Sequence, residues 1–176
     1  MGKMLVEITK SLKTFIENQK MFFVGTARNE GSVNISPKGM DTFRIINSNK
    51  IVWLNLTGSG NETAAHLQEN NRMTILFCSF EEKPLILRLY GNASIYHESD
   101  SEYKEHISLF SKHIGARQII TMEVNAVQTS CGFAVPFMEF KEERSQLTSW
   151  SKKKGKDGIQ QYWKDKNSMS IDGYDI

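Results

Sequence analysis

The spacing of apolar residues changes from a helical to a strand period after residue 20 of the chain. In the first segment, apolar residues recur at intervals of three to four with Lys and Glu between them: Leu5, Ile8, Leu12, Phe15 and Ile16. This spacing places the apolar side chains on one face and predicts an amphipathic helix that ends near Gln19.

Strand-like segments dominate the following hundred or so residues. Short apolar or alternating runs are separated by turn residues, and most connections are too short to contain a crossover helix. The runs cover residues 21–27, 32–36, 43–46, 51–56, 72–80, 85–97 and 117–127. The pattern predicts an antiparallel sheet, and so many strands bury their edges best when the sheet closes into a barrel.

Local motifs predict how these strands are joined. Residues 29–31 (Asn-Glu-Gly) form a hairpin-type turn, and Gly91 interrupts the longest strand, which favours a bulge or a bend there. The S-x-x-E spacing at 59–62 and again at 99–102 predicts a capping box at the start of two short helices.

The chain changes character beyond Pro136, where polar residues increase and helical spacing returns. Gly155 divides this region, so we expect two short helices, with Asp157 capping the second. Their apolar residues are Leu147 and Trp150, then Ile159, Tyr162 and Trp163. We expect residues 1–140 to form the β domain, and residues 141–176 to form a helical extension packed on it within the same domain.

Composition limits the classes of function. A hydrophobic content of 39% in 176 residues is enough for a folded core, and a net charge of +2 does not favour nucleic acid or an anionic membrane as partner. No apolar run is long enough to span a bilayer, and residues 1–7 lack the apolar stretch of a signal peptide.

The cysteine and histidine residues do not have the spacing of a metal site. Cys78 and Cys131 lie far apart in apolar surroundings, and the four histidines form no HxH or HExxH pair. We therefore expect no metal, two buried free thiols, and a reducing, cytoplasmic location.

Residues 58–63 (Gly-Ser-Gly-Asn-Glu-Thr) are the best candidate for ligand chemistry. Glycines let backbone N–H groups approach an anion, and Ser59, Asn61 and Thr63 supply further donors at the start of a helix. The segment is not a dinucleotide fingerprint, because Thr63 replaces the third glycine and no βαβ unit surrounds it. Two interpretations stay open: an ordinary capped turn, or a phosphate cradle.

Three further residues have both a structural and a functional interpretation. Lys38 lies between Ser-Pro and Gly39. It is interpreted either as a lysine of a surface turn or as a cation that contacts a phosphate or a flavin carbonyl. Arg88 interrupts an apolar strand. One interpretation is an ion pair with a carboxylate such as Glu62 or Glu123, and the other is a contact with a ligand. Trp163 belongs to a helix packed on the barrel or to a lid over a pocket.

Several segments together resemble the pyridoxamine 5'-phosphate oxidase-like family of flavin-binding split barrels. Their order and spacing carry the resemblance, which covers most of residues 10–173: residues 36–39, 52–67, 72–77, 88–91 and, for an uncharacterised branch of the family, 166–173. The resemblance implies a mainly β domain with a six-stranded antiparallel split barrel, which works as a homodimer with FMN in a groove at the interface.

The same resemblance implies roles for individual residues. The FMN phosphate would lie near Ser59, Asn61 and Thr63, with Lys38 nearby. The strand edge at Trp53 and Leu54 would pass along the isoalloxazine ring, where backbone groups often serve.

Two departures from the family pattern matter. The oxidases begin this helix with Ser-Arg-Lys, whereas this chain has Asn61-Glu62-Thr63, and Glu62 is negative. Charge-assisted hydrogen bonds are about twice as strong as neutral ones, so phosphate affinity falls unless Lys38 or Arg88 compensates. The Arg-Leu-x-Pro substrate motif is also missing from the C-terminal residues, so we do not expect oxidation of pyridoxamine phosphate.

The leading hypothesis is an FMN-dependent oxidoreductase that acts on an unidentified small molecule, with no catalytic residue identified. The first alternative is a flavin, haem or deazaflavin carrier or sensor without turnover, because a fold does not fix a function. The second alternative is an interaction protein whose groove binds no ligand.

Overall fold

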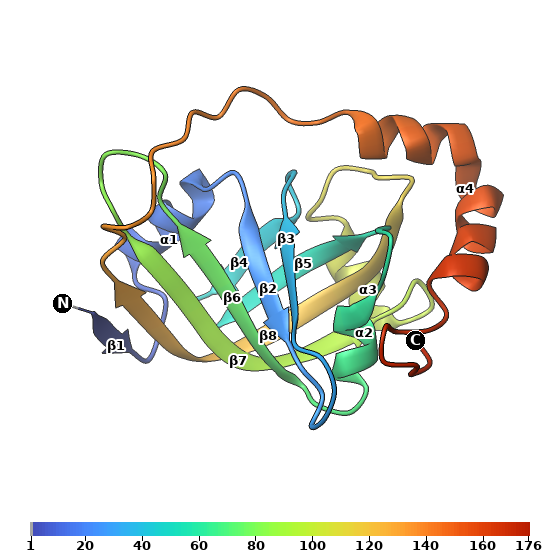
Figure 1. The fold of residues 1–176 in the computed structure, drawn as a ribbon, viewed down its shortest axis with the longest axis horizontal. Helices are drawn as coiled ribbons and strands as arrows, with labels where there is room; N and C mark the ends of the chain where they lie inside the picture. The colour runs from blue at the N-terminus through green and yellow to red at the C-terminus, as the bar shows by residue number, and fades with distance from the viewer. Residues whose placement is uncertain (1) are drawn as a thin grey trace.

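The computed structural model describes residues 2–176 (Figure 1). In this range the chain forms eight strands and four helices: β1 (Lys3–Leu5), α1 (Lys10–Asn18), β2 (Phe22–Thr26), β3 (Asn34–Lys38), β4 (Phe43–Asn47), β5 (Lys50–Leu56), α2 (Glu62–Leu67), β6 (Arg72–Cys78), β7 (Ile86–Tyr96), α3 (Ser101–Ile107), β8 (Ala116–Ser130) and α4 (Gln146–Lys166).

All strands belong to one antiparallel sheet in the order β3-β2-β6-β7-β8-β5-β4, with β1 paired to β8. The sheet curves round (Figure 1), but β3 and β4 stand at opposite ends of the order and do not pair with each other in the described chain. The protein is therefore a mainly β split barrel, as expected from the sequence.

The structure has eight strands, whereas the sequence pattern gave seven strand-like runs and the resemblance implied a barrel of six. β8 runs to Ser130, three residues past the predicted end, and its final stretch offers a free edge opposite β7. β1 fills that edge, with Leu5 opposite Val127 and Lys3 opposite Thr129. The predicted N-terminal helix is for this reason shorter than its apolar pattern: it begins at Lys10, and the Thr9 side chain accepts a hydrogen bond from the Leu12 amide.

The main core fills the barrel, and a smaller one lies outside it. Phe22, Phe43 and Phe77 pack together inside, with ring centroids 5.0–5.8 Å apart. Leu12 and Ile16 of α1 join this core, which identifies α1 as a helix that packs against the barrel interior. The smaller core lies on the other face of β5 and β8, where these side chains meet: Val52, Leu54, Tyr103, Phe110 and Ile119.

Neither predicted capping box forms. α2 starts after Asn61 and α3 after Asp100, and neither residue makes a side-chain capping bond. The Glu62 carboxylate instead accepts from the backbone of Ile171, and the Ser99 hydroxyl bonds to Asp100. The first capping box is missing because Glu62 bonds to a distant residue, and the second is missing because α3 begins after Asp100 instead of after Ser99.

The C-terminal helix is bent where the sequence predicted a break. Gly155 has φ of 67° and ψ of 176°, which separates two helical halves within α4. The two halves contact each other through Trp150 and Tyr162, whose rings meet edge to face at 5.0 Å. None of the described helices combines the length and the apolar character needed to cross a bilayer.

The two cysteines differ in exposure, although the sequence predicted that both would be buried. Cys78 is partly buried within β6. Cys131 is exposed, because it follows the end of β8 and lies outside the sheet. Both thiols are free, as expected.

The central pair of strands depends on a glycine. The pairing of β7 with β8 shifts register between Tyr90 and Gly91, which confirms the predicted bulge. A Cβ atom on Gly91 would lie 1.9 Å from the carbonyl oxygen of Glu123, so the strands meet here more closely than any side chain allows.

We expect Gly91→Ala to lower the free energy of unfolding by about 3 kcal/mol, because the clash is with backbone that cannot turn aside. Urea unfolding would measure the loss. Gly25→Ala is the matched control: its Cβ would come no closer than 3.7 Å to any neighbour, so its effect should stay below about 1 kcal/mol. Equal effects at both sites would contradict this account.

Candidate functional site

Two adjoining cavities lie at the split of the barrel, between β3 and the end of β5. One, of about 400 Å³, is lined by β3, the 58–61 turn, the start of α2 and Ile171. The other, of about 200 Å³, continues along Trp53 and Leu54 towards Met40. Both are lined by Lys38, Asn55 and other shared residues, so they form one groove. Five of the predicted residues meet in the larger cavity: Lys38, Ser59, Asn61, Glu62 and Thr63.

Lys38 is the cation of this groove. Its ammonium lies 5.0 Å from the centre of the Trp53 ring, and no carboxylate within residues 2–176 forms an ion pair with it. Burial lowers the pKa of Lys38, because removal of water disfavours the charged form. An unpaired, poorly solvated ammonium beside a cavity favours an anionic ligand.

Asn61 carries an unused donor beside the same cavity. Its side chain is 5% exposed, and its Oδ1 accepts a hydrogen bond of 2.9 Å from Asn55. Asn55 also donates to Gln118, which fixes the orientation of both amides. The Nδ2 atom of Asn61 is buried and has no partner among the described residues. Buried donors without partners are rare in folded proteins, so this atom points to an acceptor from outside the chain, such as a phosphate oxygen.

A row of hydroxyl and amide groups extends along β3, which the sequence analysis did not identify. Ser36 donates to Asn34, and Asn34 donates to the Thr63 hydroxyl at 3.3 Å. Because the Thr63 oxygen accepts from Asn34, its proton is left to donate elsewhere. The alternation of Asn34, Ser36 and Lys38 on one face of β3 was the available signal, since all three line the larger cavity.

The remaining predicted residues contribute less directly. Trp53 and Leu54 are almost wholly buried, each in a different core cluster, so their side chains serve packing. The Leu54 amide donates to Thr42. Ser59 lines the cavity, and its carbonyl accepts from Asn167. α2 has only six residues, so its dipole is a minor source of attraction for an anion.

Arg88 lies away from this cluster. It stands in β7 opposite Leu76 and Gln128, donates a hydrogen bond of 3.1 Å to Ser130, and lines neither cavity of the groove. It pairs with neither Glu62 nor Glu123. Of the two cations that the sequence suggested for the site, Lys38 lines the groove and Arg88 does not.

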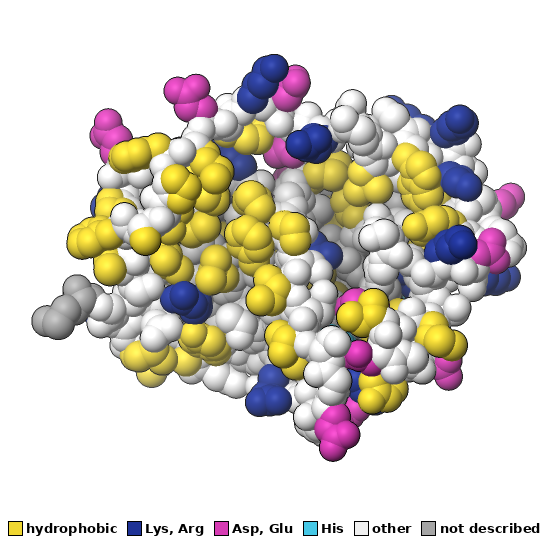
Figure 2. Space-filling model, in the orientation of Figure 1, with side chains coloured by type: hydrophobic (Ala, Val, Ile, Leu, Met, Phe, Trp, Pro, Cys, Tyr) yellow, Lys and Arg dark blue, Asp and Glu magenta, His cyan; other side chains and the backbone are white. Residues whose placement is uncertain are grey.

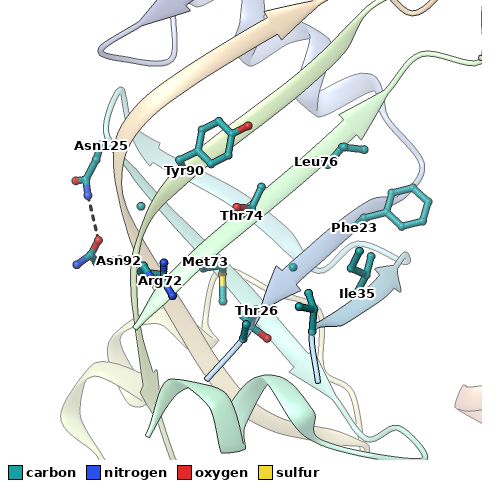
Figure 3. A pocket seen from close by; sticks show the side chains of 14 residues that line it. Phe23, Thr26, Ile35, Arg72, Met73, Thr74, Leu76, Tyr90, Asn92 and Asn125 are labelled. Carbon is teal, nitrogen blue, oxygen red and sulfur yellow. Dashed lines mark hydrogen bonds between the residues drawn. The ribbon is translucent and has the colours of Figure 1, made fainter. Parts of the chain in front are cut away.

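A hollow of about 820 Å³, larger than either cavity of the groove, lies on the outer face of the sheet (Figure 3). Phe23, Ile35, Leu76 and Tyr90 project into it from neighbouring strands. Apolar side chains gather over β7, β6 and β2 on this face (Figure 2). Polar side chains such as Arg72 and Asn92 also line the hollow, but most of its exposed surface is apolar and no buried donor without a partner lies in it among the described residues. Its lining therefore suits an apolar surface better than a phosphate ester.

The chain matches the sequence model of the family described as pyridoxamine 5'-phosphate oxidase over residues 8–131. It is also 36% identical over 137 residues to the pyridoxamine 5'-phosphate oxidase family protein ustO of Aspergillus flavus. That match covers 75% of this chain and 55% of the relative, so the chain spans about half the length of the curated protein. This chain belongs to the pyridoxamine 5'-phosphate oxidase family.

Solved structures with little sequence identity share the fold. HupZ of Group A Streptococcus has a TM-score of 0.53 at 22% identity, over 68% of this chain and 91% of that one. A protein of Lactobacillus delbrueckii reaches 0.58 at 13%, over 70% and 94%. HutZ, the haem storage protein of Vibrio cholerae, reaches 0.52 at 14%, over 72% and 97%.

The burial of Lys38 leads to a test of the groove without any ligand. The pKa of Lys38 is lower in the folded chain, so the unfolded chain binds the proton more tightly. The positive charge therefore destabilises the fold at neutral pH. This destabilisation decreases as the pH rises towards 10.5, the ordinary pKa of lysine. We expect Lys38→Met to raise the free energy of unfolding by about 1 kcal/mol at pH 7. Urea unfolding would show this, with exposed Lys13→Met as the control. A loss of stability in Lys38→Met would contradict the account.

Proposed function

We propose that this protein is an FMN-binding flavoprotein and an oxidoreductase for a small organic molecule. The observation that carries the proposal is the pairing, in one cavity, of an unpaired desolvated ammonium with a buried amide donor that lacks an acceptor. Family membership makes a flavin phosphate the natural acceptor.

The residues of the groove fit such a phosphate. Lys38 would supply the charge, Asn61 Nδ2 and the Thr63 hydroxyl would donate, and the 58–60 turn can bring backbone N–H groups close because two of its residues are glycines. Glu62 opposes the site less than its charge suggests, because both carboxylate oxygens accept from the Ile171 amide.

The narrower cavity along Trp53 and Leu54 would hold the ring of the cofactor. The flavin, when bound, supplies electron and hydride transfer, while the protein supplies orientation and electrostatics. Lys38 lines both cavities, so one ammonium can serve the phosphate side of the groove and the ring side.

Haem is the second candidate ligand. The fold shared with HutZ supports it, and His113 lines a cavity of about 350 Å³ that adjoins the groove through Met40, Leu56 and Leu147. A histidine at the edge of a groove is a suitable axial ligand for haem iron. A deazaflavin bound without turnover would use the same groove as FMN.

A homodimer would cover the outer apolar face. Val33 and Ile35 are 71% and 68% exposed there, beside the hollow of about 820 Å³. Ile35 lies on the same strand as Asn34 and Ser36, which line the groove from the opposite face, so a second copy on this face would lie next to the site. We also propose a cytoplasmic location, because both cysteines are free.

We expect the wild-type protein to bind FMN with micromolar or better affinity, measured by quenching of flavin fluorescence. Lys38→Ala and Thr63→Ala together should raise the Kd for FMN about a hundredfold, because a charged and a neutral donor are lost. Arg88→Ala is the control and should leave the Kd within about twofold.

A parallel titration with haemin, followed in the Soret region, separates the two ligands. Haemin binding that is lost in His113→Ala, together with no FMN binding, would replace the flavin proposal with the haem one. FMN binding that is insensitive to the double substitution would remove the phosphate assignment.

We expect Ile35→Glu to convert a dimer into a monomer in solution, measured by light scattering at several concentrations, because it places a carboxylate in the apolar face. Val6→Glu is the matched control, since Val6 is 79% exposed but lies outside the hollow. A wild-type monomer would contradict the dimer directly.

A further inference from the structure

Two residues near the C-terminus form hydrogen bonds with Thr57 and Ser59, which belong to the turn between β5 and α2 (residues 57–61). The indole N–H of Trp163 donates to the Thr57 hydroxyl at 2.9 Å. The side-chain amide of Asn167 donates to the Ser59 carbonyl at 3.1 Å. Trp163 of α4 and Asn167, which follows α4, thus each bond to one residue of the turn. Asn167 is 1% exposed, which makes its contact with Ser59 a buried one.

Arg117 holds Asn167 in this position. Its guanidinium donates to Asn167 Oδ1 at 2.8 Å and lies 5.1 Å from the centre of the Trp163 ring. Burial lowers the pKa of Arg117 to about 10, and no carboxylate in the described chain pairs with it. The arginine thus fixes the oxygen of the Asn167 amide, which leaves the nitrogen to face Ser59.

The C-terminal segment, residues 170–174, lies beside α2 (Figure 1, red). Ile171 lines the cavity while its amide donates to Glu62. Asp172 accepts from both the amide and the hydroxyl of Ser32, at 2.8 and 2.9 Å, on the β2–β3 hairpin. These two hydrogen bonds lower the pKa of Asp172, so the carboxylate is charged at neutral pH. The Tyr174 ring centre lies 3.7 Å from the Arg28 guanidinium.

These contacts come from a part of the chain that the family match does not reach. The match ends at residue 131, whereas the supporting residues lie between Trp163 and Tyr174. The larger cavity is therefore bounded mostly by residues of the family match and, at Ile171, by the C-terminal segment beyond it.

We infer that Asn167 is a positioning residue for the phosphate turn, and that Asp172 latches the C-terminal segment over the bound phosphate. This inference rests on the proposed function. Asn167 keeps the Ser59 carbonyl turned back towards α4, so the N–H groups of the turn stay available to the cavity. The latch slows the departure of a phosphate ester, because it holds Ile171 against one side of the cavity.

The test compares FMN with riboflavin, which lacks the phosphate. Asn167→Ala should raise the FMN dissociation rate at least tenfold and leave riboflavin dissociation within twofold. Asp172→Asn should raise the FMN rate severalfold. The controls are Asn70→Ala, which removes a buried amide bonded to Asn29 and Arg72 at the far end of α2, and Asp175→Asn in the exposed C-terminal segment. Neither control should change the FMN rate by more than twofold.

Amide hydrogen exchange on the ligand-free protein provides a second measurement. Asn167→Ala should speed exchange in residues 57–63, and Asp172→Asn should speed it in residues 168–176 and at Ser32. Unchanged exchange in both variants, or equal effects on FMN and riboflavin, would overturn the inference. If the wild type binds no flavin, the proposed function fails, and inorganic phosphate becomes the probe. Phosphate should then slow amide exchange in residues 57–63 of the wild type but not in Asn167→Ala. Protection by phosphate that persists in Asn167→Ala would overturn the positioning role.

Discussion

The antiparallel pairing of β7 with β8 is the constraint on which the rest of the structure depends. The pairing extends along all of β7, and each strand carries a further partner: β6 on one side, and β5 followed by β1 on the other. The close approach of Gly91 to the Glu123 carbonyl sets the bulge, and the bulge sets which residues of β8 face the core on either side of it. Because every other strand is added outward from this pair, β3 and β4 become the two ends of the sheet and do not pair with each other in the described chain.

The groove gains its chemistry from an arrangement that a closed barrel would not permit. In a closed barrel the inward residues of β3 would be covered, but here Asn34, Ser36 and Lys38 face a cavity. Lys38 is poorly solvated, and Asn61 has a donor without an acceptor in the described chain, so both groups are electrostatically unfavourable where they stand. Such unfavourable groups are typical of binding sites, where the ligand supplies the missing partner.

Glu62 and Thr63 stand where the resemblance to the family implies two cations, and the structure around Glu62 changes how its charge acts on the groove. Glu62 does not act as an isolated negative charge, because the C-terminal segment supplies its hydrogen-bond donor. The same segment is bonded to Ser32 and stacked on Arg28. In the proposed site Lys38 supplies the positive charge, and low solvent exposure would strengthen its attraction for an anion.

The sequence by itself determined the antiparallel β class, the positions of nearly all strands, the Gly91 bulge and the break at Gly155, because strand periodicity, glycine and turn residues act over short distances. The grouping of Lys38 with the 58–63 turn was implied by the resemblance to the family, and the fold brings both to one cavity. It did not determine the eighth strand or the helix caps, since residues 3–5, Ser59 and Glu62 took partners more than a hundred positions away. It also grouped Arg88 with the site on its residue type, whereas the register of β7 directs it to Ser130. The unpaired Asn61 donor and the hydrogen bond from Asn167 to Ser59 were decided only by the tertiary structure. Both depend on which residues distant in the sequence come into contact, and a local sequence pattern does not contain that information.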